Sequence, residues 1–84
     1  MTDSPIALIS GAAQGIGLAC AEALAEDGYK VILADVKDMV VSEGERLGGA
    51  GYVCDFGDVD AIHNLFERIE SEHGPVSALV NNAG

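Results

Sequence analysis

The chain has 84 residues, so it can form one small domain at most, and a chain of this length buries its surface inefficiently. Fourteen acidic residues against four basic ones give a formal net charge of −10, which argues against binding to nucleic acid or to an anionic membrane surface. About half of the residues are apolar, yet no apolar run approaches the roughly 20 residues that span a bilayer, and the start of the chain lacks the features of a signal peptide.

The apolar pattern of the first part of the chain alternates between strand and helix signatures. The continuous apolar run from Ile6 to Ser10 predicts a strand that is buried on both faces. A helical stripe begins at Ile16, and Asp27-Gly28 predicts its end, with Gly28 as the C-cap. Residues Lys30–Ala34 predict a second buried strand.

The middle of the chain repeats this alternation with weaker signals. A helix is predicted between the second strand and Gly48-Gly49, and Gly44 is expected to interrupt it. GYVCDF, residues 51–56, predicts a third strand. Another helix follows, and either Asp58 or Asp60 is its expected N-cap.

The last elements complete the pattern of an α/β protein. Gly74-Pro75 ends the third helix, and the run from Val76 to Val80 predicts a fourth strand. Four strands that alternate with three helices predict an open parallel sheet with right-handed crossover connections.

Cysteine and histidine usage predicts no metal site. Cys20 and Cys54 lack a CxxC spacing, so we expect reduced, buried thiols in a cytoplasmic protein, with a disulfide or a metal pair as the minor alternative. His63 and His73 lie on the third predicted helix or at its end, and neither is assigned a catalytic or metal-binding role.

Three glycines separate the first strand from the first helix, in the stretch SGAAQGIG. Open α/β sheets bind ligands at the carboxyl ends of their strands, and a helix N-terminus attracts phosphate. Gly11 allows a tight turn, Gly15 leaves space where a diphosphate would approach the backbone, and Gly17 lets the helix lie close to the sheet. The spacing GxxxGxG differs from the commoner GxGxxG fingerprint, and no Gly-Lys-Ser/Thr follows as in a P-loop. The alternative is a glycine-rich turn that binds nothing.

Polar side chains follow the other three strands. Asp35 stands directly after the second strand, where a carboxylate accepts hydrogen bonds from the adenosine ribose of NAD; the alternative is a surface aspartate. Asp55, near the end of the third strand, could meet the adenine amino group or could simply cap the strand end. NNAG, residues 81–84, could bridge strands and leave space beside the ribose, or form an ordinary polar turn. The four strand ends are expected to converge on one crevice.

In this order these motifs resemble the N-terminal half of the short-chain dehydrogenase/reductase family. The family's glycine motif is TGxxxGxG, which this chain matches with Ser10 in place of the Thr, and the NNAG match is complete. The resemblance covers essentially the whole chain. It implies a Rossmann-like doubly wound parallel sheet, truncated after the fourth strand, with residues 1–84 as the N-terminal part of a single dinucleotide-binding domain. It also implies that the cofactor is bound by Gly11, Ala13, Gln14, Gly15, Ile16, Gly17, Asp35, Asp55, Phe56, Asn82, Ala83 and Gly84.

The same resemblance favours NAD over NADP as the cofactor. NADP-dependent members neutralise the 2′-phosphate, usually with an Arg or Lys in the glycine loop or just after the second strand. Here Gln14 precedes Gly15, and Asp35 would repel the phosphate as well as bind the free hydroxyls of NAD. Lys37 is the one contrary residue, and we interpret it as a solvated loop lysine.

No residue of this chain is predicted to be catalytic. Family members use a Ser, a Tyr-x-x-x-Lys pair and often an Asn beyond the NNAG segment, whereas Tyr29 and Tyr52 have no Lys four residues on. The resemblance therefore implies the cofactor-binding portion of an NAD-dependent oxidoreductase, whose alcohol or carbonyl substrate and homo-oligomeric state belong to a full-length parent. The alternative is a stand-alone nucleotide-binding or interaction module without catalytic activity.

Overall fold

Strands and helices alternate along the chain, as the apolar pattern predicts. The computed structural model describes residues 4–82. Its elements are β1 (Ile6–Ser10), α1 (Gly15–Glu26), β2 (Lys30–Asp35), α2 (Met39–Arg46), β3 (Ala50–Val53), α3 (Val59–Glu72) and β4 (Ala78–Val80).

The four strands form one parallel sheet in the order β3-β2-β1-β4. Leu8 of β1 pairs in register with Ile32 of β2 on one side and with Leu79 of β4 on the other. The chain builds the sheet outward from β1 to β3 and then returns through α3 to the other side of β1. The strand order therefore reverses between β1 and β4, which is where a doubly wound sheet opens a crevice for ligands.

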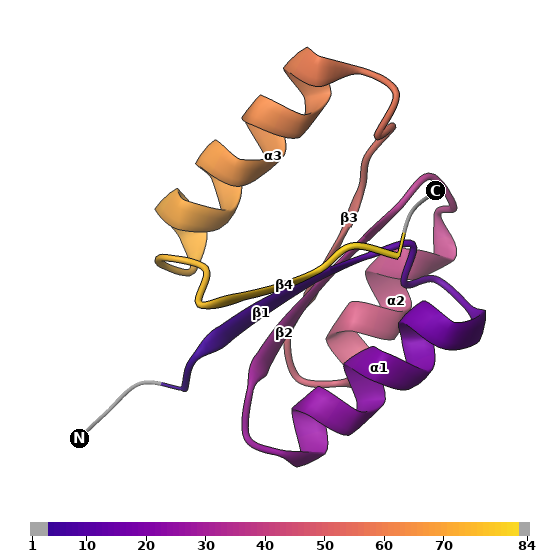
Figure 1. The fold of residues 1–84 in the computed structure, drawn as a ribbon, viewed down its shortest axis with the longest axis vertical. Helices are drawn as coiled ribbons and strands as arrows, with labels where there is room; N and C mark the ends of the chain where they lie inside the picture. Colours follow the sequence, from indigo (N-terminus) through magenta and orange to yellow (C-terminus); the bar gives the residue numbers. More distant parts are fainter. Residues whose placement is uncertain (1–3, 83–84) are drawn as a thin grey trace.

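Helices cover both faces of the sheet, with α1 and α2 on one face and α3 on the other (Figure 1). Along β1, Leu8 points to the α3 face and packs with Ile32 and Ile69, whereas Ile9 points to the α1 face and packs with Leu33. Burial on both faces explains why β1 is a continuous apolar run. Each such aliphatic side chain contributes about 1.5–3 kcal/mol by leaving water. The predicted doubly wound parallel α/β fold is confirmed.

The helix α2 lies directly on β3, and glycines make this contact possible. A Cβ atom on Gly44 would collide with the carbonyl group of Ala50, and one on Gly51 would collide with the backbone of Val40. The expectation that Gly44 interrupts the helix is wrong, because α2 runs through it, and Gly44 is buried against the strand. Its missing side chain serves packing rather than helix termination.

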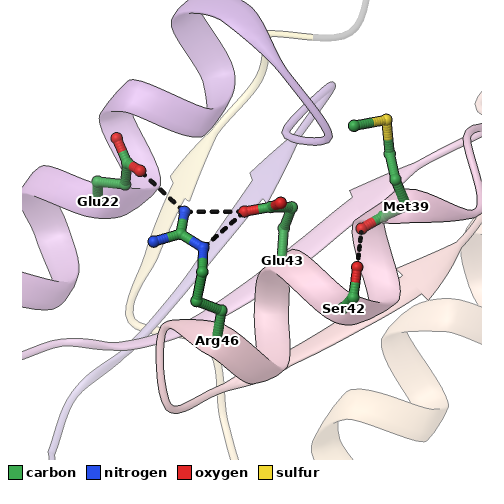
Figure 2. A network of polar contacts seen from close by, with 5 residues as sticks. All are labelled: Glu22, Met39, Ser42, Glu43 and Arg46. Atoms are coloured by element: carbon green, nitrogen blue, oxygen red, sulfur yellow. Dashed lines mark hydrogen bonds and ion pairs between the residues drawn. The ribbon is translucent and has the colours of Figure 1, made fainter.

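An arginine joins the two helices of this face. The Arg46 guanidinium contacts Glu22 of α1 and Glu43 of α2, each at 2.8 Å (Figure 2). The side chains of Arg46 and Glu22 are about half exposed, so solvent screens the ion pairs, and we attribute the stability of the α1–α2 face to its apolar core.

The strand ends differ from the predicted ones for local reasons. The predicted third strand continued to Phe56, but β3 ends at Val53. The chain then turns at residues 56–57, where the Asp55 carboxylate accepts a hydrogen bond from the backbone of Gly57. Asp58, not Asp60, caps α3: its side chain accepts hydrogen bonds from the N–H groups of Asp60 and Ala61.

Both cysteines are free thiols, but only Cys54 is buried as predicted, while Cys20 on α1 is partly exposed. Burial raises the pKa of the Cys54 thiol. Among residues 4–82, no helix is long and apolar enough to cross a membrane.

A cluster of polar side chains fastens the end of α3 to β3. The Tyr52 hydroxyl donates a hydrogen bond to Glu72 and lies 2.9 Å from Nε2 of His73, and the guanidinium of Arg68 covers its ring. Burial and the Glu72 hydrogen bond raise the pKa of Tyr52 to about 12, so the phenol keeps its proton. The phenol O–H donates its hydrogen bond to Glu72, so the phenol oxygen can only accept from His73. Nε2 of His73 therefore carries a proton and is the donor. Its Nδ1 is then an unprotonated acceptor, buried and without a partner among the described residues.

We expect this histidine to make the fold sensitive to mild acid. Burial, together with the positive charge of Lys30, holds the pKa of His73 below its usual value, against the opposite effect of Glu72. As the pH falls through the ordinary histidine pKa of about 6.5, the unfolded chain takes up a proton that the folded chain resists, so the free energy of unfolding decreases.

The melting temperature of the wild type should therefore fall between about pH 7.5 and 5.5, and that of His73→Gln should fall much less over the same range. His63→Gln, at an exposed position of α3, should keep the wild-type decrease. An equal decrease in all three proteins would contradict the prediction.

Candidate functional site

The carboxyl ends of the strands surround a pocket of about 540 Å³. It lies at the edge of the sheet where the strand order reverses between β1 and β4. Its walls come from all four strand ends, and its lining residues are Gly11, Asp35, Val36, Asp55, Phe56, Gly57 and Asn82.

The glycine loop between β1 and α1 borders this pocket. Gly11 and Gly15 have φ angles of 62° and 64°, a left-handed conformation that other residues adopt at a cost. A Cβ atom on Gly15 would have no neighbour within 4 Å, so the space beside it is open. The next residue, Ile16, is 75% exposed.

A glycine is needed at position 17 because the Gly11 carbonyl lies too close to leave room for a side chain, and not because of the backbone angles of Gly17. A Cβ atom there would collide with the carbonyl oxygen of Gly11 and would lie 2.8 Å from Nδ2 of Asn82. The first turn of α1 thus rests on the glycine loop and on the end of β4. The expectation that Gly17 allows close packing is confirmed, but the partner is this loop and not a strand face.

The amino end of α1 is not capped by a side chain. Its N-cap residue, Gln14, makes no side-chain cap hydrogen bond, and the first turn of α1 contains no acidic residue. In the same chain, α3 is capped by Asp58 and has Asp60 in its first turn. The helix α2 also lacks a side-chain cap hydrogen bond, but its N-cap residue is the acidic Asp38, whereas that of α1 is the neutral Gln14. Among the helices of residues 4–82, the N–H groups at the start of α1 are therefore the best placed to bind an anion, which the helix dipole attracts.

Asp35 and Asp55 place carboxylates on the pocket wall. Oδ2 of Asp35 accepts a hydrogen bond from the Ala13 N–H at 3.0 Å, and Oδ1 accepts one from the Lys37 N–H at 3.1 Å. Oδ1 of Asp55 accepts a hydrogen bond from Gly57 at 2.9 Å. Both carboxylates are held by backbone donors, and each retains lone pairs for a ligand.

The ends of β1 and β4 are joined by polar contacts at the pocket. The backbone N–H of Asn82 donates to Oγ of Ser10 at 2.9 Å, and its side-chain amide donates to the Gly11 carbonyl at 3.2 Å. Ser10 Oγ in turn donates to the side-chain oxygen of Asn81 at 3.1 Å. Asn82 therefore bridges β4 to the glycine loop, and the hydroxyl of Ser10 makes the contact that a Thr could make. Ala83 and Gly84 lie outside the described residues.

The structure brings most of the predicted site residues together. The pocket lining includes Gly11, Asp35, Asp55, Phe56 and Asn82. Five further predicted residues form the loop and first turn of α1 beside it: Ala13, Gln14, Gly15, Ile16 and Gly17.

Two lining residues, Val36 and Gly57, were not predicted. Each directly follows a predicted residue, Asp35 or Phe56, so their signal is their place just past a strand end. No group of three or more His, Cys, Asp or Glu side chains that could hold a metal ion occurs within residues 4–82.

The sequence model of the family described as short chain dehydrogenase matches residues 5–84. The chain belongs to this family. Members of the family bind nicotinamide cofactors. Relatives of this chain include proteins named as reductases, as an oxidoreductase and as a dehydrogenase.

Two curated relatives are similar along nearly all of the chain. The 3-oxoacyl-[acyl-carrier-protein] reductase MabA of Mycobacterium bovis is 42% identical over 77 residues, which cover 92% of this chain and 29% of the relative. The 3-oxoacyl-[acyl-carrier-protein] reductase FabG of Escherichia coli is 39% identical over 85 residues, which cover 98% of this chain and 35% of the relative. The chain thus spans about a third of the length of these members of the short-chain dehydrogenase family.

Solved structures of the family superpose closely on this fold. The 2-keto-3-deoxy-D-gluconate dehydrogenase from Streptococcus agalactiae has a TM-score of 0.85 and 39% identity, covering 98% of this chain and 33% of its own. An actinorhodin polyketide ketoreductase, solved with NADPH, has a TM-score of 0.89 and 33% identity. The match covers 96% of this chain and 33% of the ketoreductase.

Proposed function

We propose that residues 1–84 form the N-terminal part of one dinucleotide-binding domain, and that they bind NAD for an oxidoreductase. The reaction is hydride transfer between NAD(H) and an alcohol or carbonyl substrate. The observation that carries this proposal is the pocket itself, because a strand-end carboxylate and the glycine loop that leads to an uncapped helix N-terminus border it together.

The residues in and beside the pocket would contact a dinucleotide in four places. The diphosphate would lie against the amino end of α1, where Gly15 leaves open space and the N–H groups point outward. Asp35 would accept hydrogen bonds from the adenosine ribose hydroxyls, and Asp55 would accept one from the adenine amino group beside Phe56. Asn82 would border the nicotinamide side, because it joins β4 to the glycine loop.

The bound nicotinamide ring would supply the hydride chemistry, and this chain would supply binding and orientation. The sequence has no Tyr-x-x-x-Lys pair, so a proton donor and the substrate pocket would come from a longer protein that contains these residues. The substrate, the homo-oligomer and the overall activity are properties of that longer protein in this proposal.

The carboxylates favour NAD over NADP. A 2′-phosphate at the adenosine ribose would lie beside the negative charge of Asp35, and the only nearby cation in the sequence is Lys37. The polyketide ketoreductase with NADPH demonstrates that a relative of this chain accommodates the phosphorylated cofactor. The choice therefore depends on residues near Asp35.

Calorimetry of the 84-residue chain with NAD and with NADP tests the proposal. We expect NAD to bind at least about tenfold more tightly, a difference of about 1.4 kcal/mol. We also expect no turnover of NADH or NAD with a panel of ketones and alcohols, because the chain has no positioned proton donor. Tighter binding of NADP would reject the assignment to NAD. Failure of a folded chain to bind either dinucleotide would support the interaction-module alternative, and turnover would show that the catalytic groups lie within these residues.

A further inference from the structure

Both oxygens of the Asp35 carboxylate accept hydrogen bonds from backbone donors. Oδ2 accepts a hydrogen bond from the N–H of Ala13, which lies 22 residues earlier in the glycine loop. Oδ1 accepts one from the N–H of Lys37, in the turn that leads to α2. Ala13 is fully buried. A single side chain at the end of β2 therefore joins two loops that border the pocket.

The glycine loop depends on such contacts for a defined shape. It is flanked by Gly11 and Gly15, and glycine loses more conformational freedom on being fixed than any other residue. The structure gives two other hydrogen bonds that tie the loop to strand ends. The Ala12 N–H donates to the Ala34 carbonyl at 3.3 Å, and the Gly11 carbonyl accepts from Asn82 at 3.2 Å. The Asp35 bond is shorter, and it involves a charged acceptor, which makes it the stronger type.

We propose that Asp35 is a positioning residue for the glycine loop, and that it orients Ala13 and the amino end of α1 before any dinucleotide binds. This inference rests on the proposed function and adds a second role to the residue that would recognise the ribose. A carboxylate has about four lone-pair sites, so Asp35 can keep both backbone bonds while it accepts ribose hydroxyls. Because NAD and NADP share the diphosphate that the loop would bind, loss of the positioning contact weakens both dinucleotides. For NADP, removal of the repulsion between Asp35 and the 2′-phosphate offsets part of that loss.

Hydrogen exchange in the ligand-free protein tests the positioning role directly. In Asp35→Ala, the amide of Ala13 should exchange at least about tenfold faster, since a hydrogen bond to a charged group is lost. Asp35→Asn keeps one carbonyl oxygen and should give an intermediate rate, and it decides the question if the alanine variant does not fold. Asp38→Ala is the matched control: it removes the same charge nearby, from a residue whose side chain makes no cap hydrogen bond to α2. Unchanged exchange at Ala13 in both Asp35 variants would overturn the proposal.

Binding measurements separate the two roles of Asp35. The positioning role predicts that Asp35→Ala weakens NAD about 10- to 100-fold and NADP by a smaller factor, with both losses measurable by calorimetry. If Asp35 acted on the ribose alone, NADP affinity would stay the same or increase in this variant, and that result would overturn the positioning role. If the wild-type chain binds neither dinucleotide, the proposed function fails, but the exchange rate of Ala13 still decides whether Asp35 positions the loop.

Discussion

Gly15→Val should abolish dinucleotide binding while the protein remains folded. A Cβ atom at this position would meet no heavy atom within 4 Å, so the side chain starts in open space and not against the fold. It would project into the open space at the amino end of α1, where the diphosphate would lie. We expect NAD affinity to fall by at least about a hundredfold, or about 3 kcal/mol, measured by calorimetry on protein whose circular dichroism spectrum is unchanged.

Gly28→Val is the control for backbone strain in that experiment. Gly15 has a φ of 64°, so any side chain costs about 1–2 kcal/mol there, and valine costs more. Gly28 has a φ of 99° at the carboxyl end of the same helix, and it is also open within 4 Å. Its valine variant should lose at least as much stability, because this φ lies further from the left-handed region, yet it should bind NAD like the wild type. Undiminished binding by Gly15→Val would reject the diphosphate site, and lost binding in Gly28→Val would assign the effect to strain.

The fold was largely predictable because its strongest sequence signals come from the centre of the sheet. The strand β1 has the predicted bounds, since burial on both faces makes every residue from Ile6 to Ser10 buried. Signals weaken toward the edges: the predicted fourth strand began at Val76, but β4 begins at Ala78, after Ser77 bonds to the Ile6 carbonyl. The strand order and the face that each helix covers depend on contacts between distant residues, which a local pattern does not contain.

The candidate site was predictable where the spacing of the glycines marks a turn, and not where a side chain acts across the fold. The tight turn predicted at Gly11 agrees with its φ of 62°, which glycine adopts without steric cost. The bond from Ala13 to Asp35 connects residues 22 apart, and nothing in the alternation of apolar and polar residues marks it. His73 was assigned no role, because its hydrogen bond to Tyr52 depends on how α3 packs against β3.

Gly17→Ala should destabilise the protein, although alanine is the better helix former. In the interior of a helix, alanine is favoured over glycine by about 1 kcal/mol. Against this gain, the new methyl group would collide with the Gly11 carbonyl oxygen and lie 2.8 Å from the Asn82 amide. The carbonyl belongs to the backbone and is held by Asn82, so relief requires the first turn of α1 to move away from the loop. Overpacking of this kind costs about 1–3 kcal/mol, and a broken hydrogen bond adds about 0.5–1.5 kcal/mol.

The collision therefore outweighs the propensity, and we expect a net loss of about 1–3 kcal/mol in the free energy of unfolding, measured by urea titration. Binding of NAD should fall in the same variant, because the loop and the amino end of α1 move together. A double-mutant cycle with Asn82→Ala identifies the cause. Removing the amide relieves one of the two collisions, so the double variant should lose less stability than the sum of the two single variants. A Gly17→Ala protein as stable as the wild type would show that α1 does not rest on the glycine loop, and strictly additive losses would exclude Asn82 as a partner in the collision.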